Sequence, residues 1–236
     1  GWSFSRRMPI GVAIKPHQPT DYHLVRNTKA CLGALRRNAF RWRLSLGISW
    51  FWLFGALWLT QLPEFTALYL GGDAGVATAL LVLFSVGIGI GSLACHTLVK
   101  VLAPGRVVMV GGLLMAALSL LVPSQTHVGE LLHLSQWLET PGIWRHIIQL
   151  TAMGVSAGLY IVPLYVLIQV DAAEHERAQV IAGINVLNAL FMVSSALAAM
   201  IVLGLLGLSL YSLMISLGVL TLLTTWLWRF ERAPEL

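Results

Sequence analysis

The chain has 236 residues, of which 57% are apolar and only 11% charged, and its formal net charge is +5. Soluble domains average roughly 25% charged residues, so this chain has too few charges to cover a water-facing surface. The composition excludes a disordered chain, a disulfide scaffold and a free-standing soluble enzyme, and indicates a protein whose main solvent is a lipid bilayer. Its two cysteines, Cys31 and Cys95, give no disulfide framework and no metal-ligand cluster, so we expect neither a metal nor another cofactor.

The first 43 residues form a basic segment without an apolar run long enough for a signal peptide. From Thr28 to Arg43 apolar side chains alternate with arginines, which is typical of a helix lying on an anionic cytoplasmic membrane surface. A solvated linker that only sets the topology is the alternative. Because the chain begins with Gly1 and not with Met, we expect it to be an excerpt from a longer protein.

The rest of the chain, residues 44–236, is expected to be an all-α domain of six transmembrane helices. A membrane helix needs about 20 mostly apolar residues to cross ~30 Å of hydrocarbon. The expected spans are Leu44–Leu70, Ala74–Val99, Val101–Val122, Ile143–Val170, Val180–Leu205 and Leu208–Trp228. The third span is the weakest, because Pro104 and Arg106 interrupt its start.

The basic residues predict the orientation of the spans. If there are six, fourteen of the fifteen Lys and Arg residues share one side of the membrane, and only Arg145 lies on the other. The fourteen are nine residues before the first span and Lys100, Arg106, Arg177, Arg229 and Arg232. By the positive-inside rule both termini are cytoplasmic. The positive net charge then needs no nucleic-acid partner.

Spans one to three and four to six are expected to form two inverted repeats. Pro63 lies nineteen residues after Leu44 in the first span, and Pro163 lies nineteen after Trp144 in the fourth. Because three spans separate them, the two helices run in opposite directions. Broken helices at corresponding positions of inverted repeats point to a transporter binding region. We therefore expect both prolines to break their helices at membrane depth and to take part in gating.

Polar side chains are concentrated in the first, fourth and fifth spans, whereas the third and sixth have almost none. Polar groups rarely face lipid, so the first, fourth and fifth spans should face protein or a water-filled path. The candidate substrate-binding residues are Gln61, Glu64, Gln149, Asn185 and Asn188. The four carboxamides among them would hydrogen-bond a headgroup, or else join neighbouring helices.

The charged candidates lie near the ends of the spans. Glu64 is either a proton site or partner for a cationic headgroup, or a carboxylate already wetted at the outer interface. Arg145 would pair with Glu64 as an outer gate or with a substrate phosphate, or simply extend to the lipid headgroups. Arg177 belongs with Asp171 and Glu176 to a solvated loop, with pairing of Arg177 to a helix C-terminus at a cytoplasmic gate as the functional alternative.

Three glycines, Gly87, Gly89 and Gly91, lie inside the second expected span. A phosphate-binding loop needs a strand before its glycines, and here an apolar helix surrounds them. Gly87 and Gly91 instead form a GxxxG motif, which lets two membrane helices approach closely. The motif predicts a tight helix–helix contact.

Several runs along nearly the whole chain carry a family resemblance. They are Ser49–Ala56 (SWFWLFGA), Leu59–Pro63 (LTQLP), Val86–Leu93 (VGIGIGSL), Gly158–Tyr165 (GLYIVPLY) and Arg177–Ala182 (RAQVIA) with Asn185. The chain resembles the C-terminal half of a major facilitator superfamily transporter, and within it the bacterial lysophospholipid transporters, including forms fused to an acyltransferase. It departs from them in lacking the N-terminal six helices and in the short loop between the second and third spans.

The resemblance implies a multi-pass protein of the bacterial inner membrane that moves lysophospholipid by alternating access. Its partners would be membrane lipid, the N-terminal six-helix half of the same transporter and, in fused forms, an acyltransferase. The acyl tail would lie along the aromatic residues of the first span, Trp50, Phe51, Trp52, Phe54 and Trp58. Alternatively, these aromatic side chains face the lipid or pack inside the bundle. One alternative is a transporter of the same superfamily for another solute, such as a drug or metabolite. The other is a membrane anchor of a fused enzyme that transports nothing.

The chain is not expected to be an enzyme itself. An acyltransferase of that type needs a His and an Asp separated by four residues, and His17 and Asp21 have only three between them.

Overall fold

The computed structural model describes residues 23–228, and every regular element among them is a helix. The order is α2 (Leu24–Arg36), α3 (Ala39–Phe65) continued by the π-helical turn η1 (Thr66–Leu70), α4 (Ala74–Leu98), α5 (Pro104–Leu120), the short α6 (Leu134–Leu138), α7 (Ile143–Asp171), α8 (Arg177–Ala199) continued by the π-helical η2 (Met200–Leu205), and α9 (Leu210–Trp228). The all-α expectation is confirmed for this part of the chain.

Five helices are long and apolar enough to cross a membrane, namely α3 with η1, α4, α7, α8 with η2, and α9. The third of the six expected spans corresponds to α5, which has 17 residues and is a shorter apolar helix. It is short because Pro104 occupies its first turn, where the missing N–H costs no hydrogen bond. The described helices fit a membrane-embedded protein, with five clear candidate spans.

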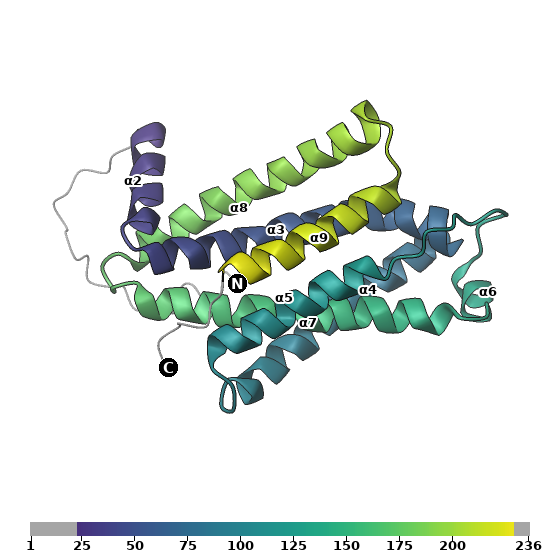
Figure 1. Cartoon of the computed structure of the whole chain (residues 1–236), viewed down its shortest axis with the longest axis horizontal. Coiled ribbons are helices and arrows are strands. Elements are labelled where there is room, and N and C mark those ends of the chain that lie inside the picture. The colour runs from purple at the N-terminus through teal and green to yellow at the C-terminus, as the bar shows by residue number, and fades with distance from the viewer. Residues whose placement is uncertain (1–22, 229–236) are drawn as a thin grey trace, which may run out of the picture.

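The long helices pack around α7 (Figure 1). Both α4 and α5 lie against α7, while α8 lies against α3 and α9 lies against α5. Among the five candidate spans, α7 is the most buried and α8 the least. The fourth expected span is therefore central, whereas the fifth, although polar in places, lies at the edge of the described bundle.

Glycines bring α4 and α7 into backbone contact. A Cβ atom added to Gly87 or Gly91 would overlap with the backbone of α7 at Thr151 and Val155 respectively. Gly154 and Gly158 on α7 meet the backbone of α4 in the same way. The close contact predicted from the GxxxG motif is confirmed, and its partner is a second small-residue pair with the same spacing.

The expected breaks at the two prolines are absent, and this prediction was wrong. The α7 helix is continuous through the buried Pro163, and α3 continues past Pro63 into η1. After Pro63 the helix adapts through Thr66, whose N–H and hydroxyl both bond to the carbonyl of Leu62. A proline removes one backbone hydrogen bond, and the remaining bonds and the packing hold both helices together. The proline positions therefore give no support to a broken-helix binding site.

The α2 helix lies across the ends of α3 and α8 and runs nearly perpendicular to the bundle (Figure 1). It is shorter than the helix expected over 28–43, because Asn38 ends the turn and caps α3 by accepting a hydrogen bond from the N–H of Phe40 at 2.9 Å. The first span consequently begins at Ala39, and the domain boundary expected after residue 43 falls inside α3. The basic residues in 1–22 and at 229 and 232 lie outside the described part of the chain.

Candidate functional site

A polar cluster at membrane depth joins α3, α7 and α8. Asn188 lies eleven residues into the 29-residue span formed by α8 and η2, and it is buried. With its carboxamide oriented to satisfy both ends, Asn188 donates to the Ser49 hydroxyl at 2.9 Å and accepts from the indole N–H of Trp52 at 3.0 Å. The same indole N–H lies 3.2 Å from the hydroxyl oxygen of Tyr165. Three helices thus place an amide, an indole and a phenol together.

The cluster is accessible from one side. Trp52 is 38% exposed and Tyr165 is partly buried, whereas Ser49 and Asn188 are buried behind them. The Trp52 indole N–H already bonds within the cluster, so the partly exposed hydroxyl of Tyr165 is the group that keeps an O–H to offer a bound molecule. Of the predicted binding residues, Asn188 is the one placed in this cluster.

The aromatic residues of the first span do not form a single face. Trp50, Phe54 and Trp58 are buried in the core, and the Trp50 indole donates to the Thr221 hydroxyl on α9 at 3.2 Å. Phe51 and Trp52 remain partly exposed and pack edge to face with their centroids 5.9 Å apart. The expected tail-binding surface is thereby reduced to these two residues.

The other predicted binding residues lie apart from the cluster. Buried Gln149 donates a hydrogen bond to the Leu118 carbonyl of α5 at 2.8 Å, so its amide joins two helices. Gln61 is half-buried, and Glu64 and Asn185 are exposed. The hydrogen bonds found within residues 23–228 connect none of the five predicted residues to another.

The predicted gating residues do not form the expected pairs within the described chain. Arg145 and Glu64 are both exposed and make no ion pair with each other there, and Arg177 is exposed at the start of α8. Arg145 instead lines two adjoining cavities of about 430 and 370 Å³ beside the start of α7. Pro163 lines an apolar cavity of about 260 Å³ between α4 and α7.

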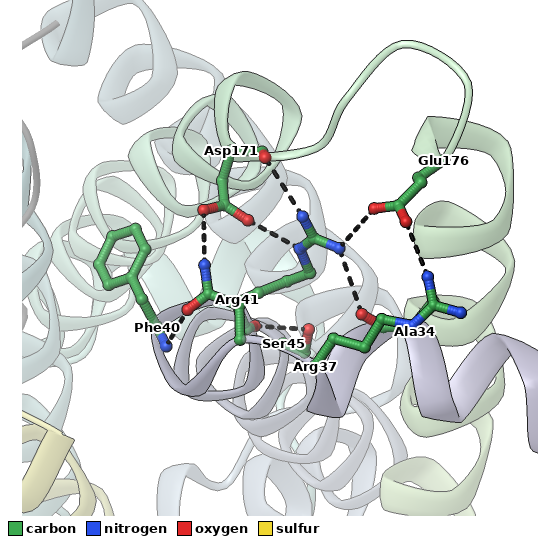
Figure 2. A network of polar contacts seen from close by, with 8 residues as sticks. Ala34, Arg37, Phe40, Arg41, Ser45, Asp171 and Glu176 are labelled. Atoms are coloured by element: carbon green, nitrogen blue, oxygen red, sulfur yellow. Dashed lines mark hydrogen bonds and ion pairs between the residues drawn. The ribbon is translucent and has the colours of Figure 1, made fainter.

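A network around Arg41 holds the helix ends near α2 together (Figure 2). The buried guanidinium of Arg41 donates to Asp171 at 2.7 Å and to Glu176 at 3.1 Å, and also to the carbonyl of Ala34 at 3.2 Å. Arg37 reaches the other oxygen of Glu176 at 2.8 Å. One side chain therefore connects the end of α2, the start of α3, the end of α7 and the loop before α8.

Sequence reasoning missed this network. It assigned Asp171 and Glu176 to a solvated loop and counted Arg41 among the arginines that set the topology. One signal was present in the sequence: Arg41 precedes Leu44 and Ile48 by three and seven residues, so it shares the helix face that both apolar residues bury. An arginine aligned with a buried face predicts a buried partner.

Arg41 also affects the acidity of its partner. A hydrogen bond from Arg41 is the main reason that the pKa of Glu176 lies below its ordinary value, and the charge of Arg37 adds to the effect. Glu176 is therefore ionised throughout the physiological pH range. The network consists of two cationic and two anionic side chains.

The arrangement offers hydrogen bonds and charge rather than a set of reacting groups. Within residues 23–228 no group of three His, Cys, Asp or Glu side chains is placed to hold a metal ion. The cluster of Trp52, Asn188 and Tyr165 places polar groups between three helices, and the Arg41 network connects helix ends. Comparison with known protein families, curated proteins and solved structures finds no match to this chain.

Proposed function

We propose that this chain is the six-helix half of a secondary transporter of the major facilitator type, which moves lysophospholipid or a related amphiphile across the bacterial inner membrane. The observation that carries the proposal is the cluster of Trp52, Asn188 and Tyr165. Burying polar side chains at membrane depth is costly, and such residues usually mark a substrate path. Here they sit beside partly exposed aromatic surface, which suits a molecule with a polar headgroup and an apolar tail.

The packing of the helices supports an inverted repeat. Exchanging α3, α4 and α5 with α7, α8 and α9 turns the α4–α7 contact into the α8–α3 contact, and both are among the main contacts of the bundle. The α3–α7 and α5–α9 contacts map onto themselves, whereas the extensive α5–α7 contact maps onto a much smaller contact between α3 and α9. Two similar three-helix units related by such an exchange are the building plan of many transporters. These helix contacts do not involve a break at either proline.

In the proposal α5 also crosses the membrane, and with the five candidate spans it brings the number of spans to six. Its 17 residues make a helix of about 26 Å, slightly shorter than an average hydrocarbon core, and a bilayer thins locally around short spans. The start of α3 and the end of α9 lie toward the same end of the bundle (Figure 1), as an even number of passes requires. With the positive-inside rule, both termini are placed in the cytoplasm.

The transport cycle would proceed by rocking of this half against a second six-helix unit. The headgroup would bind at Asn188, Trp52 and Tyr165, and the tail would lie against Phe51. The Arg41 network would keep the ends of α3, α7 and α8 together, so that the half moves as one body. Asn185, exposed one turn before Asn188, would face the second unit or the substrate.

The test is uptake of labelled lysophosphatidylethanolamine into spheroplasts that express the full-length protein, normalised to folded protein. Asn188→Leu together with Trp52→Phe removes the amide and the indole N–H of the cluster and leaves the hydroxyls of Ser49 and Tyr165. Loss of one or two hydrogen bonds to substrate should lower the apparent affinity roughly five- to hundredfold. Gln149→Leu is the matched control, because its amide bonds to α5, so it should lower stability and leave uptake per folded molecule unchanged.

Three results would contradict the proposal in whole or in part. Wild-type uptake by the Asn188 and Trp52 double variant would remove the cluster as the site. If the unsubstituted protein moves no lysophospholipid but moves a drug or metabolite, the substrate is wrong and the transporter half remains. If it moves nothing and only retains an acyltransferase at the membrane, the anchor alternative holds.

A further inference from the structure

Two cavities of different character adjoin at the start of α7 and share Arg145. The larger, about 430 Å³, lies between the end of α5 and the first turns of α7, and its wall is mostly apolar, with Leu118, Leu121 and Ile148. The smaller, about 370 Å³, is more polar and is lined by His127, Thr140 and His146. The guanidinium of Arg145 therefore marks the boundary between an apolar groove and a polar, basic pocket.

This boundary carries uncompensated positive charge. Arg145 and His146 lie in the first turn of α7, where the helix dipole is positive and disfavours cations. That turn begins at Gly142, which has no side chain to cap it. Arg145 makes no ion pair with any residue in 23–228. An anion bound here would balance the charge of Arg145 and the positive helix end together.

The position matches the depth of lipid headgroups. Trp144 and Ile148 are 63% and 65% exposed on the surface of α7. Tryptophan is enriched at the membrane–water interface, and the start of α7 is the end of a candidate span. A phospholipid has its phosphate at this level and its acyl chains in the hydrocarbon, so one lipid could place a phosphate at Arg145 and a chain along the apolar groove.

We propose that the cavities around Arg145 bind one phospholipid of the adjacent leaflet. Its phosphate lies on Arg145 beside His146, and one acyl chain fills the groove between α5 and α7. The two cavities together match the phosphate and the chain of a lipid, whereas a free anion would use only the polar one. The site requires only that the chain is embedded in a membrane, so a failed transport assay leaves it standing.

The test is native mass spectrometry of the detergent-purified full-length protein titrated with dioleoylphosphatidylglycerol. Arg145→Gln should weaken binding of one lipid roughly tenfold. Arg106→Gln is the matched control, since it removes an exposed arginine at the opposite end of α5. Inorganic phosphate and diolein, which each carry one part of the lipid, should not compete. Both variants should keep the melting temperature of the wild type, because neither side chain is buried.

A second measurement locates the lipid without depending on the variant. A photo-crosslinking amino acid in place of Ile148 should capture the lipid, while the same group in place of Val86, exposed on α4, should capture less. Equal lipid binding by the two arginine variants, or equal capture at both positions, would overturn the proposal. Displacement of the lipid by millimolar phosphate would assign the site to a free anion and overturn it as well.

Discussion

The two ends of the helical bundle are held together by different chemistry. At the Arg41 end, the charged side chains Arg37, Arg41, Asp171 and Glu176 connect four elements (Figure 2). At the opposite end, which we call the α6 end, the loop before α7 folds over the turn between η1 and α4 through backbone bonds. Leu132 donates to the Gly71 carbonyl at 2.8 Å, and its own carbonyl accepts from the N–H of Asp73 at 3.1 Å.

Side chains at the α6 end complete the backbone pairing rather than replace it. The buried indole of Trp137 donates to the Leu70 carbonyl at 2.8 Å, and Asp73 caps α4 through the N–H groups of Gly75 and Val76. His133 adds a hydrogen bond to the second oxygen of Asp73, which becomes an ion pair when the imidazole is protonated. The comparison shows that an arginine can hold helices that share no backbone pairing, and that it concentrates the stabilisation of one end in a single residue.

The largest expected effect is loss of the Arg41 network. Arg41→Gln leaves Asp171 and Glu176 without their cation, and breaking such a largely buried pair should lower the free energy of unfolding by about 2–3 kcal/mol. Arg43→Gln, which changes an exposed arginine two residues away, should change it by less than about 0.5 kcal/mol. Thermal unfolding in detergent measures both. Equal effects would mean that the Arg41 end is held by packing alone.

Between the two ends, the α4–α7 contact depends on the absence of side chains. Gly91→Ala places a methyl group against the backbone of Val155 and should destabilise the protein by about 1–3 kcal/mol. Gly89→Ala, on the same helix, meets nothing within 4 Å and should be nearly neutral. The same unfolding assay separates them. If both substitutions are neutral, α4 and α7 can separate without cost, and the contact does not couple the ends.

A smaller effect is expected at the α6 end. Asp73→Asn removes the charge facing His133 but keeps an acceptor for the first turn of α4, because Asn is also a good N-cap residue. The melting temperature should fall less than for Arg41→Gln, since the backbone bonds of Leu132 remain. Asp73→Ala removes the cap as well, so it should lower the melting temperature more than Asp73→Asn does. A drop in Asp73→Asn as large as that of Arg41→Gln would erase the difference between the two ends.

A change of pH within the neutral range should have the smallest effect on the stability of the protein. The pKa of Asp73 is lowered mainly by the N–H of Val76 and then by His133, and the pKa of Glu176 is lowered by Arg41. A carboxylate with a lowered pKa stabilises the folded state above its ordinary pKa, and this contribution is lost as the pH falls through the folded value. The ordinary pKa values of the two side chains are 3.8 and 4.5, well below pH 6. The stability that these groups contribute should therefore be constant between pH 6 and 8 and should fall in acid.

Arg41→Gln sharpens that measurement. Without Arg41, the pKa of Glu176 should return toward its ordinary value, so the variant should lose less stability than the wild type when the pH is lowered to 3. The share that belongs to Asp73 should remain. Melting temperatures of both proteins across this pH range supply the comparison, and parallel curves would show that Glu176 is not coupled to Arg41.

The sequence by itself determined the helices and their approximate ends. Long apolar stretches separated by Gly and Pro turns predicted the five candidate spans and α5, and the GxxxG motif of Gly87 and Gly91 predicted a close crossing. These features depend on neighbours within a few residues, and local physical chemistry specifies them. The start of the first span was placed five residues late, because Arg41 and Arg43 looked like the end of a basic surface segment.

Only the tertiary structure decided which polar residues meet. The Arg41–Asp171 and Ser49–Asn188 contacts join residues 130 and 139 positions apart. Amphipathic patterning identifies the buried face of a helix in water, but a membrane helix is apolar on all sides, so the pattern does not say which neighbour it touches. That is why Gln149 and Asn188 looked alike in the sequence, although one bonds to α5 and the other belongs to the cluster with Trp52. The packing of α3 against α7 and α8 made that distinction.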